Sequence, residues 1–476
     1  MDKYKRLGKN TLLILLGNAG SKLITLIMLP IYTHWLSPEE YGTTDVILSY
    51  SSLALGAISM CIADAIFVIS KKVEDYEKKQ LYTSGWFFSI VVFAITAIIC
   101  YFIRYIALKT DTMVLLRDII WYVYFVAFSS FIQSYTQSFT QAIDKLKIYS
   151  LTGVVNTAAI AGFAFIFIPH MGVRGYVYSI IAAYLCSAAF SFFSSKSYNY
   201  VDLRLIDRNE LVKLLKYGMP LVPNTLMFWM VNGLTRPFVA QYVGLEANGI
   251  LAVANKIPGI ISALFLVFGN AWTISMIEEY DKPGFVKFFD NSIRATLVPV
   301  TIFACLLALF SEEVIRIIAD AAYIEAYKYV PIAILGSLLA GISGMVGGIF
   351  AAKQQSKYFF YSSVWGATVS VLSMFLLIPR FQLYGATISV CLSFLAMVIA
   401  RYLYTRKDLQ GFKFDIVVKM LLGYIIIAVI VPLDISRIWK FAIGFLIIFY
   451  LSYSNKDVLT AAINKITKRY VEKNRA

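Results

Sequence analysis

The chain has 476 residues, of which 59% are hydrophobic, and its mean hydropathy is +0.71. This apolar share exceeds the roughly 45–50% of soluble globular proteins, which excludes a water-soluble particle. The formal net charge of +15 would suit a nucleic-acid binder, but the basic residues are spread between long apolar runs, so no nucleic-acid partner is expected.

Apolar runs of about 20 residues recur along the chain, and each can cross roughly 30 Å of hydrocarbon as a helix. The first run follows a basic N-terminus, but its length and the Lys22 in its middle predict a retained helix rather than a signal peptide. The chain is therefore expected to be an all-α integral membrane protein. We expect about fourteen transmembrane helices, at residues 11–32, 42–70, 81–103, 114–140, 149–169, 174–195, 215–242, 248–277, 290–310, 327–352, 358–379, 383–404, 416–432 and 438–454.

The distribution of Lys and Arg predicts the topology. With the N-terminus in the cytoplasm, 31 of the 43 basic residues fall in cytoplasmic segments, nine on the opposite side and three inside the membrane. This asymmetry follows the positive-inside rule and places both termini in the cytoplasm. The basic segments also favour binding of anionic membrane lipids.

Two sequence matches indicate an internal repeat. Residues 29–42 match residues 236–249 at an offset of 207, and residues 168–175 match residues 378–385 at an offset of 210. Because each offset spans six expected helices, we expect two parallel, pseudo-symmetric six-helix bundles around a central cavity. The expected domains are an N-terminal bundle (1–196), a cytoplasmic connector (197–213), a C-terminal bundle (214–407), and two extra helices with a basic tail (408–476).

Three cations are expected at bilayer depth, namely Lys22, Arg236 and Lys256. A charge in hydrocarbon costs about 2.5–3.5 kcal/mol on insertion scales, so these side chains need an aqueous cavity or a partner. If they line one cavity, they can bind a pyrophosphate, Arg through a bidentate fork and Lys as a point charge. Local pairing with Asp45 or with backbone carbonyls is the alternative.

Polar residues on other helices suggest further contacts. Gln133, Gln137 and Gln141 follow i, i+4, i+8 spacing and therefore share one helix face. Their amides suit sugar hydroxyls in a wet cleft, although hydrogen bonds between helices explain them as well. The side chains of Asn18 and Asn224 have the same two interpretations.

Asp45 and Asp64 are the acidic residues expected within the second helix. An intramembrane carboxylate can exchange a proton or hold Na⁺, and an H⁺ or Na⁺ gradient could then drive alternating access. The alternative is that each is a solvated charge close to a helix end.

Signatures of an enzyme are missing from the sequence. The segment 17–22 echoes a phosphate-binding loop, but its spacing is short and no strand precedes it. His34 and His170 are the only histidines, and the five cysteines are scattered singly. We therefore expect no catalytic site, no metal and no cofactor.

Two motifs resemble the polysaccharide-transport branch of the multidrug/oligosaccharidyl-lipid/polysaccharide (MOP) exporter superfamily. They are the block from Gly17-Asn18 through Pro30 to Leu36-Ser37-Pro38-Glu39-Glu40-Tyr41-Gly42, and the segment Tyr217-Gly218-Met219-Pro220-Leu221-Val222-Pro223-Asn224. The resemblance implies a MATE-like fold and a Wzx-type flippase in the bacterial inner membrane. Such a flippase moves undecaprenyl-pyrophosphate-linked repeat units of O-antigen, capsule or a similar glycan to the outer leaflet, with a polysaccharide polymerase as a partner.

Three alternative functions stay open. A lipid II flippase differs only in its substrate. A MATE-type multidrug exporter of cations would need an acidic cavity, whereas the intramembrane charges expected here are mostly basic. A membrane glycan polymerase or ligase would need a sizeable outer catalytic loop, whereas the longest expected outer loop, near residues 311–326, is short.

Overall fold

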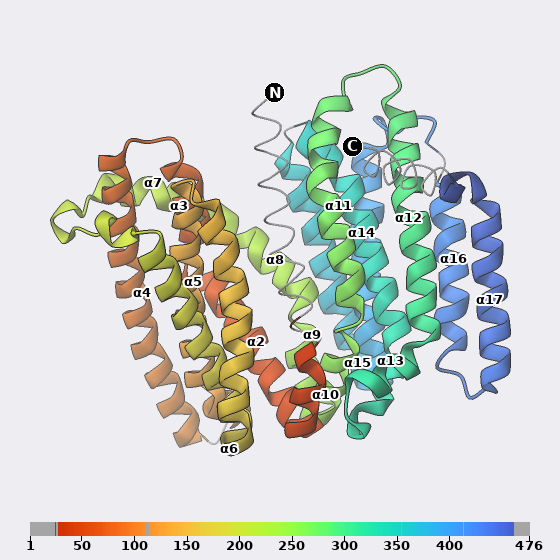
Figure 1. Ribbon diagram of the computed structural model, residues 1–476, viewed down its shortest axis with the longest axis horizontal. Helices are drawn as coiled ribbons and strands as arrows, with labels where there is room; N and C mark the ends of the chain where they lie inside the picture. The colour runs from red at the N-terminus through yellow and green to blue at the C-terminus, as the bar shows by residue number, and fades with distance from the viewer. Residues whose placement is uncertain (1–23, 25–26, 111–113, 354, 413, 461–476) are drawn as a thin grey trace, which may run out of the picture. The chain divides into compact units, whose positions relative to one another are not determined.

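The computed structural model describes residues 24, 27–110, 114–353, 355–412 and 414–460, and these are predominantly helical, without a β-strand (Figure 1). This confirms the all-α class. The chain divides into two compact units, with the boundary between Gly249 and Ile250. Each unit is described by itself. The sequence repeat predicts a different division, with two bundles separated by a connector at residues 197–213, and this division stays a prediction.

In the first unit, residues 27–35 are helical, and a bent pair of helices follows them. Ser37 and Glu40 form a capping box at the start of this pair, and positive φ angles at Met60 and Cys61 interrupt it, giving a bend of 52°. In chain order the unit contains α2 (Pro38–Ile58), α3 (Ile62–Ser70), α4 (Asp75–Thr110), α5 (Val114–Ala142), α6 (Leu146–Ser194), the 3₁₀ segments η1 (Ser197–Tyr200) and η2 (Leu203–Leu205), α7 (Arg208–Gly218), η3 (Met219–Leu221), α8 (Val222–Asn232), α9 (Thr235–Tyr242) and the start of α10 (Leu245–Ala254).

The second unit continues from α10 and ends in a hairpin of two helices. Its elements are α11 (Pro258–Glu279), α12 (Phe285–Leu309), α13 (Ser311–Ile318), η4 (Ala321–Lys328), α14 (Val330–Ala352), α15 (Ser356–Thr405), α16 (Asp415–Ile430) and α17 (Arg437–Ser454). Helices α16 and α17 pack on each other and on α12.

Helices α6 and α15 are each two antiparallel legs joined by a single non-helical residue. That residue is Gly172 in α6 (φ 52°, ψ −127°) and Gln382 in α15 (φ 49°, ψ −124°). Hydrogen bonds link the legs, from Ser187 Oγ to Asn156 Oδ1 over 3.2 Å in α6 and from Arg401 Nε to Ser362 Oγ over 3.1 Å in α15. The two segments, 210 residues apart, therefore share one backbone conformation.

Within the described residues, six helices are long and apolar enough to cross a membrane, or eight if the bent pairs α2–α3 and α10–α11 each count as one span. Two of the six, α6 and α15, contain two legs each. With the further helices α5, α8–α9 and α16, the described helices follow the expected order of spans from the second to the fourteenth. The expected number is thus broadly consistent with the structure.

Glycine contacts provide a second structural sign of the repeat. A Cβ atom added at Gly42 would lie 1.9 Å from the carbonyl oxygen of Leu245, and one added at Gly249 would lie 1.8 Å from that of Pro38. The two contacts are related by the offset of 207, and both lie within the first unit. Only glycine permits this approach of the starts of α2 and α10.

Candidate functional site

A break between α8 and α9 creates the polar centre of the first unit. Pro237 has no N–H, so the carbonyl of Gly233, four residues earlier, cannot receive the usual helical hydrogen bond. Ser49 of α2 supplies a replacement, because its hydroxyl donates to Gly233 O over 2.8 Å. At bilayer depth such a break is tolerated only where the freed backbone groups find partners or line a cavity.

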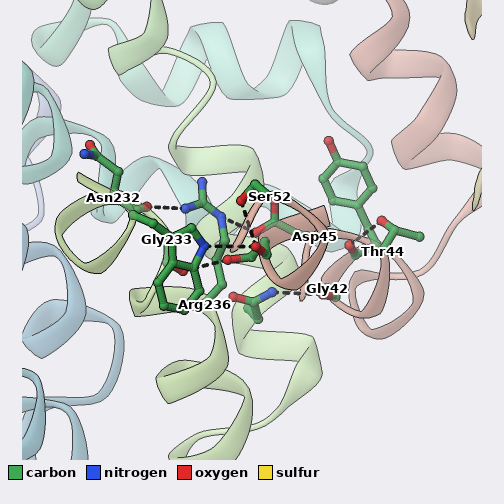
Figure 2. A network of polar contacts seen from close by, with 11 residues as sticks. Gly42, Thr44, Asp45, Ser52, Asn232, Gly233 and Arg236 are labelled. Carbon is green, nitrogen blue, oxygen red and sulfur yellow. Dashed lines mark hydrogen bonds and ion pairs between the residues drawn. The ribbon is translucent and has the colours of Figure 1, made fainter. Parts of the chain in front are cut away.

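The same break orients Arg236. Its backbone N–H bonds to Gly233 O at 3.2 Å rather than to Asn232 O, which leaves the Asn232 carbonyl without its helical donor. The Arg236 side chain folds back and donates from Nη1 to that carbonyl over 2.5 Å, while Nε donates to Asp45 Oδ2 over 2.9 Å (Figure 2). The guanidinium is therefore held from α2 and from the end of α8.

A cavity of about 390 Å³ opens beside this group, within the first unit. Trp229 forms part of its wall, and the indole N–H of this residue donates to Ser49 O over 2.9 Å, which fixes the ring. A Cβ atom at Gly233 would lie 2.4 Å from the Trp229 indole nitrogen, so the ring uses the space that glycine leaves. The lining residues are Asp45, Leu48, Ser49, Ser52, Thr225, Phe228, Trp229, Asn232, Gly233 and Arg236.

The cavity holds one cation and one anion, both partly accessible. The side chain of Arg236 is 26% exposed and that of Asp45 is 18% exposed. A guanidinium has five N–H donors, and the hydrogen bonds to Asp45 and Asn232 occupy only part of them. In the described part of the chain, no further protein acceptor is bonded to Arg236. Its remaining donors suit a planar, bidentate contact with a phosphate or carboxylate.

The described structure does not test whether the other two expected cations belong to this site. Lys22 lies outside the described residues. Lys256 follows α10 in the second unit and is half-buried. A site that combines these two lysines with Arg236 stays a prediction.

The glutamine face of α5 contacts the neighbouring helix. Gln133 Nε2 donates to Gln137 Oε1 over 2.6 Å, and Gln137 Nε2 donates to the carbonyl of Tyr149 in α6 over 3.0 Å. Gln141, one turn further along α5, is half-buried. These contacts are of the interhelical kind that was the alternative to sugar binding, and sugar contact by this face stays a prediction.

The remaining candidates are separated from one another. Asn224 is half-buried on α8, next to the cavity-lining Thr225 but not itself a lining residue, and Asn18 lies outside the described residues. Asp45 forms the ion pair with Arg236 that was considered as an alternative for this cation. Asp64 is exposed on α3. An ion-coupling role for Asp45 or Asp64 stays a prediction.

Two features of the structure, one at the site and one in the second unit, were not anticipated from the sequence. Ser49 and Trp229 hold the helix break, and the spacing of Gly233 and Pro237 within an apolar run was the signal that could have located it. Arg401 is a further buried cation, only 3% exposed, and it had been counted with the cytoplasmic basic residues. Its position before the end of the helix expected at 383–404 could have placed it inside the membrane.

Histidine, cysteine and acidic residues do not gather in groups of three or more that could hold a metal ion, as far as the described residues extend. The residues that line the cavity beside Arg236 offer ion pairing and hydrogen bonding.

Comparisons with known proteins agree on the family and the fold. A family model described as "Polysaccharide biosynthesis protein" matches residues 7–280. The uncharacterized membrane protein MJ1375 of Methanocaldococcus jannaschii is 19% identical over 405 residues, which cover 82% of this chain and 96% of that protein. A structure of the lipid II flippase MurJ in an inward closed conformation is similar with a TM-score of 0.72 and 14% identity, covering 94% of this chain and 100% of the other. An inward-facing multidrug resistance MATE family transporter of the MOP superfamily is similar with a TM-score of 0.59 and 15% identity, covering 82% of this chain and 95% of the other.

Proposed function

The chain belongs to the polysaccharide biosynthesis protein family and has the fold of MOP superfamily transporters, and we propose that it is a flippase for lipid-linked oligosaccharides. Its substrate would be an undecaprenyl-pyrophosphate-linked repeat unit of O-antigen, capsule or a similar glycan. The protein would carry this unit from the cytoplasmic to the outer leaflet of a bacterial inner membrane, with both of its own termini in the cytoplasm.

The observation that carries the proposal is the oriented guanidinium of Arg236 beside a cavity. A pyrophosphate cannot cross hydrocarbon without a compensating charge, and a partly exposed arginine with unused donors can supply it. The fixed ring of Trp229 offers an apolar wall on which the first sugar can rest. A cation exporter would need an uncompensated carboxylate, whereas Asp45 in this cavity is paired with Arg236.

Ion coupling follows from the competition for Arg236. Asp45 offsets the positive charge of the guanidinium that a substrate phosphate would contact, so a proton or Na⁺ bound to Asp45 would leave the full charge of Arg236 to the phosphate. Asp64 is the second candidate for this role. Binding of the ion and of the anionic substrate would then be mutually favourable, and an H⁺ or Na⁺ gradient could drive alternating access.

The remaining expected contacts belong to the same proposal. Lys22 and Lys256 would add positive charge for the pyrophosphate. The sugars would reach the amides of α5 and the asparagines Asn18 and Asn224. The repeat-based domains at 1–196, 214–407 and 408–476 would form two moving bundles and an appended hairpin, and a polysaccharide polymerase would receive the product.

Binding of the substrate to purified full-length protein in lipid nanodiscs tests the assignment. Arg236→Gln should weaken binding of an undecaprenyl-pyrophosphate-linked oligosaccharide at least about tenfold, and Arg236→Lys should weaken it less, because lysine keeps the charge but loses the fork. Arg294→Gln is the matched control, since Arg294 pairs with Asp290 on α12 and does not line the cavity. Wild-type affinity of Arg236→Gln would contradict the site.

Two further assays separate the alternative functions. Lipid II, which carries the same pyrophosphate on a different glycan, serves as the competing ligand, and preferential binding of lipid II would favour the peptidoglycan branch. Elongation of the oligosaccharide by the purified protein alone would contradict a transporter and favour a glycan polymerase.

A further inference from the structure

The segment between α6 and α7 presents large apolar side chains to the surroundings. Within this connector loop, residues 197–207, Leu203 is 70% exposed, Val201 is 42% exposed and Ile206 is 41% exposed. The loop projects sideways beyond α4 in Figure 1. Apolar side chains on a polar connector are costly in water, so their exposure needs an explanation.

The loop is held rigidly against the protein rather than hanging free. Thr83 Oγ1 of α4 donates to Tyr200 O over 3.0 Å and accepts from the N–H of Asp202 over 3.1 Å. The N–H of Asp207 donates to Ser84 Oγ over 2.9 Å. The ring of Tyr200 packs edge-on against Phe139 of α5, with 5.1 Å between ring centroids. The apolar tips are therefore preorganised by bonds to α4 and α5.

Helix α4 sets the depth of this loop in the membrane. The anchoring residues Thr83 and Ser84 are buried, and the exposed apolar face of α4 begins one turn further on, at Phe87, Ile90 and Val91. One helical turn corresponds to about 5.4 Å. The loop thus lies where the exposed apolar surface of α4 starts, and in a bilayer this would be the level of the headgroups and the first acyl carbons.

The basic residues in and directly after the loop complement an anionic surface. Arg204 in the loop and Arg208, the first residue of α7, are exposed. The two carboxylates of the segment are used locally, since Asp202 accepts from the N–H of Arg204 and Asp207 accepts from the N–H groups of Asn209 and Glu210. Helix starts compensate negative charge in this way, which leaves the arginines as the charges available to an external partner.

We propose that the connector loop is an interfacial anchor that binds anionic phospholipids of the adjoining leaflet. Val201, Leu203 and Ile206 would enter the outer part of the acyl region, while Arg204 and Arg208 would hold phosphate headgroups above them. Continuity with the lipid-facing side of α4 favours a lipid surface over a protein partner. The anchor is independent of the substrate cavity, and its test does not involve transport.

The test uses a photoreactive benzoylphenylalanine encoded at position 203 of the full-length protein, in nanodiscs with equal parts of phosphatidylglycerol and phosphatidylcholine. After illumination, intact mass spectrometry measures lipid adducts. Adducts should form at position 203 at least about tenfold more than with the same probe at the exposed polar position Asn209. Equal labelling at the two positions, or labelling of protein instead of lipid in native membranes, would overturn the anchor.

Lipid selectivity is measured with the probe at position 203 in charge variants. Arg204→Gln and Arg208→Gln should each lower the ratio of phosphatidylglycerol to phosphatidylcholine adducts about fivefold. Lys282→Gln, which removes a surface ion pair in the second unit, is the control and should leave the ratio unchanged. An unchanged ratio in both arginine variants would show that the loop does not select anionic headgroups.

Discussion

The helix pairs α5–α6 and α14–α15 are two copies of one backbone arrangement. Different side chains connect the two helices in each copy. Their backbones share the joint between legs, at Gly172 and at Gln382. Three positions related by the offset of 210 differ in residue type. They are Gln137, Tyr149 and Ser191 in the first copy and Gly347, Phe359 and Arg401 in the second.

In the first copy the long side chain comes from α5. Gln137 reaches from α5 to the carbonyl of Tyr149, and a short bond of 2.9 Å joins the hydroxyls of Thr140 and Ser191. All the groups are neutral, which suits hydrogen bonds between helices in a membrane.

In the second copy the long side chain comes from α15. The guanidinium of Arg401 lies 4.3 Å from the centre of the Phe359 ring and donates from Nη1 to Ser343 O over 2.7 Å. It fills the space above Gly347, where an added Cβ would lie 2.8 Å from Nη1. The comparison teaches that the repeat preserves backbone and volume, while a polar contact can be supplied from either helix.

The largest effect should come from removing Arg401. Arg401→Ala should lower the free energy of unfolding by about 3 kcal/mol, because it leaves a void and removes the hydrogen bonds to Ser343 O and Ser362 Oγ. The equivalent change in the first copy, Ser191→Ala, should cost about 1 kcal/mol. Denaturant unfolding of the full chain in detergent micelles measures both.

A length-preserving variant sharpens this contrast. Arg401→Met keeps most of the volume and removes the charge, so it should cost less than half as much as Arg401→Ala. Equal costs for Arg401→Ala and Ser191→Ala would show that the buried arginine contributes no more than a hydroxyl.

A smaller effect is expected at the joint between the legs. The backbone is left-handed at both positions, which favours glycine, so Gly172→Ala should destabilise by about 1 kcal/mol and Gln382→Gly should stabilise by up to about 1 kcal/mol. Denaturant unfolding of the full chain in detergent micelles measures both changes in stability. Changes of the same sign at both positions would contradict the equivalence of the two joints.

The smallest effect concerns the hairpin α16–α17, which follows only the second copy. Burial raises the pKa of Glu312 in α13, but hydrogen bonds and charge attraction from Arg316 and Arg437 outweigh it, so the net pKa lies below the usual 4.5. Because the folded state prefers the ionised form, this stabilisation is complete above about pH 4.5 and is lost as the pH falls through the lowered value.

Hydrogen exchange of residues 437–454 measures this effect. Protection should fall between pH 5 and pH 3 more steeply in the wild type than in Glu312→Gln, after correction for the intrinsic rate. Identical pH profiles would show that the carboxylate does not hold α17.

Much of the fold could be predicted from sequence because its signals are local. Apolar length predicted the spans, and the match of residues 168–175 with 378–385 predicted two equivalent segments that the structure shows in one conformation. The sequence did not show that Gln137 in the first copy and Arg401 in the second make the contact between helices. Each residue contacts a different helix, and the equivalent positions differ in residue type. The support of Gly233 by Ser49 depends likewise on a contact between residues 184 positions apart.

The most direct test of the central claim is transport by Arg236 variants in proteoliposomes. A labelled undecaprenyl-pyrophosphate-linked oligosaccharide is followed as it becomes accessible to an enzyme on one side of the membrane. Wild type and Arg294→Gln should translocate it at equal rates, and Arg236→Gln should be slower by at least about tenfold. Translocation by Arg236→Gln at the wild-type rate would contradict a role of this guanidinium in carrying the pyrophosphate.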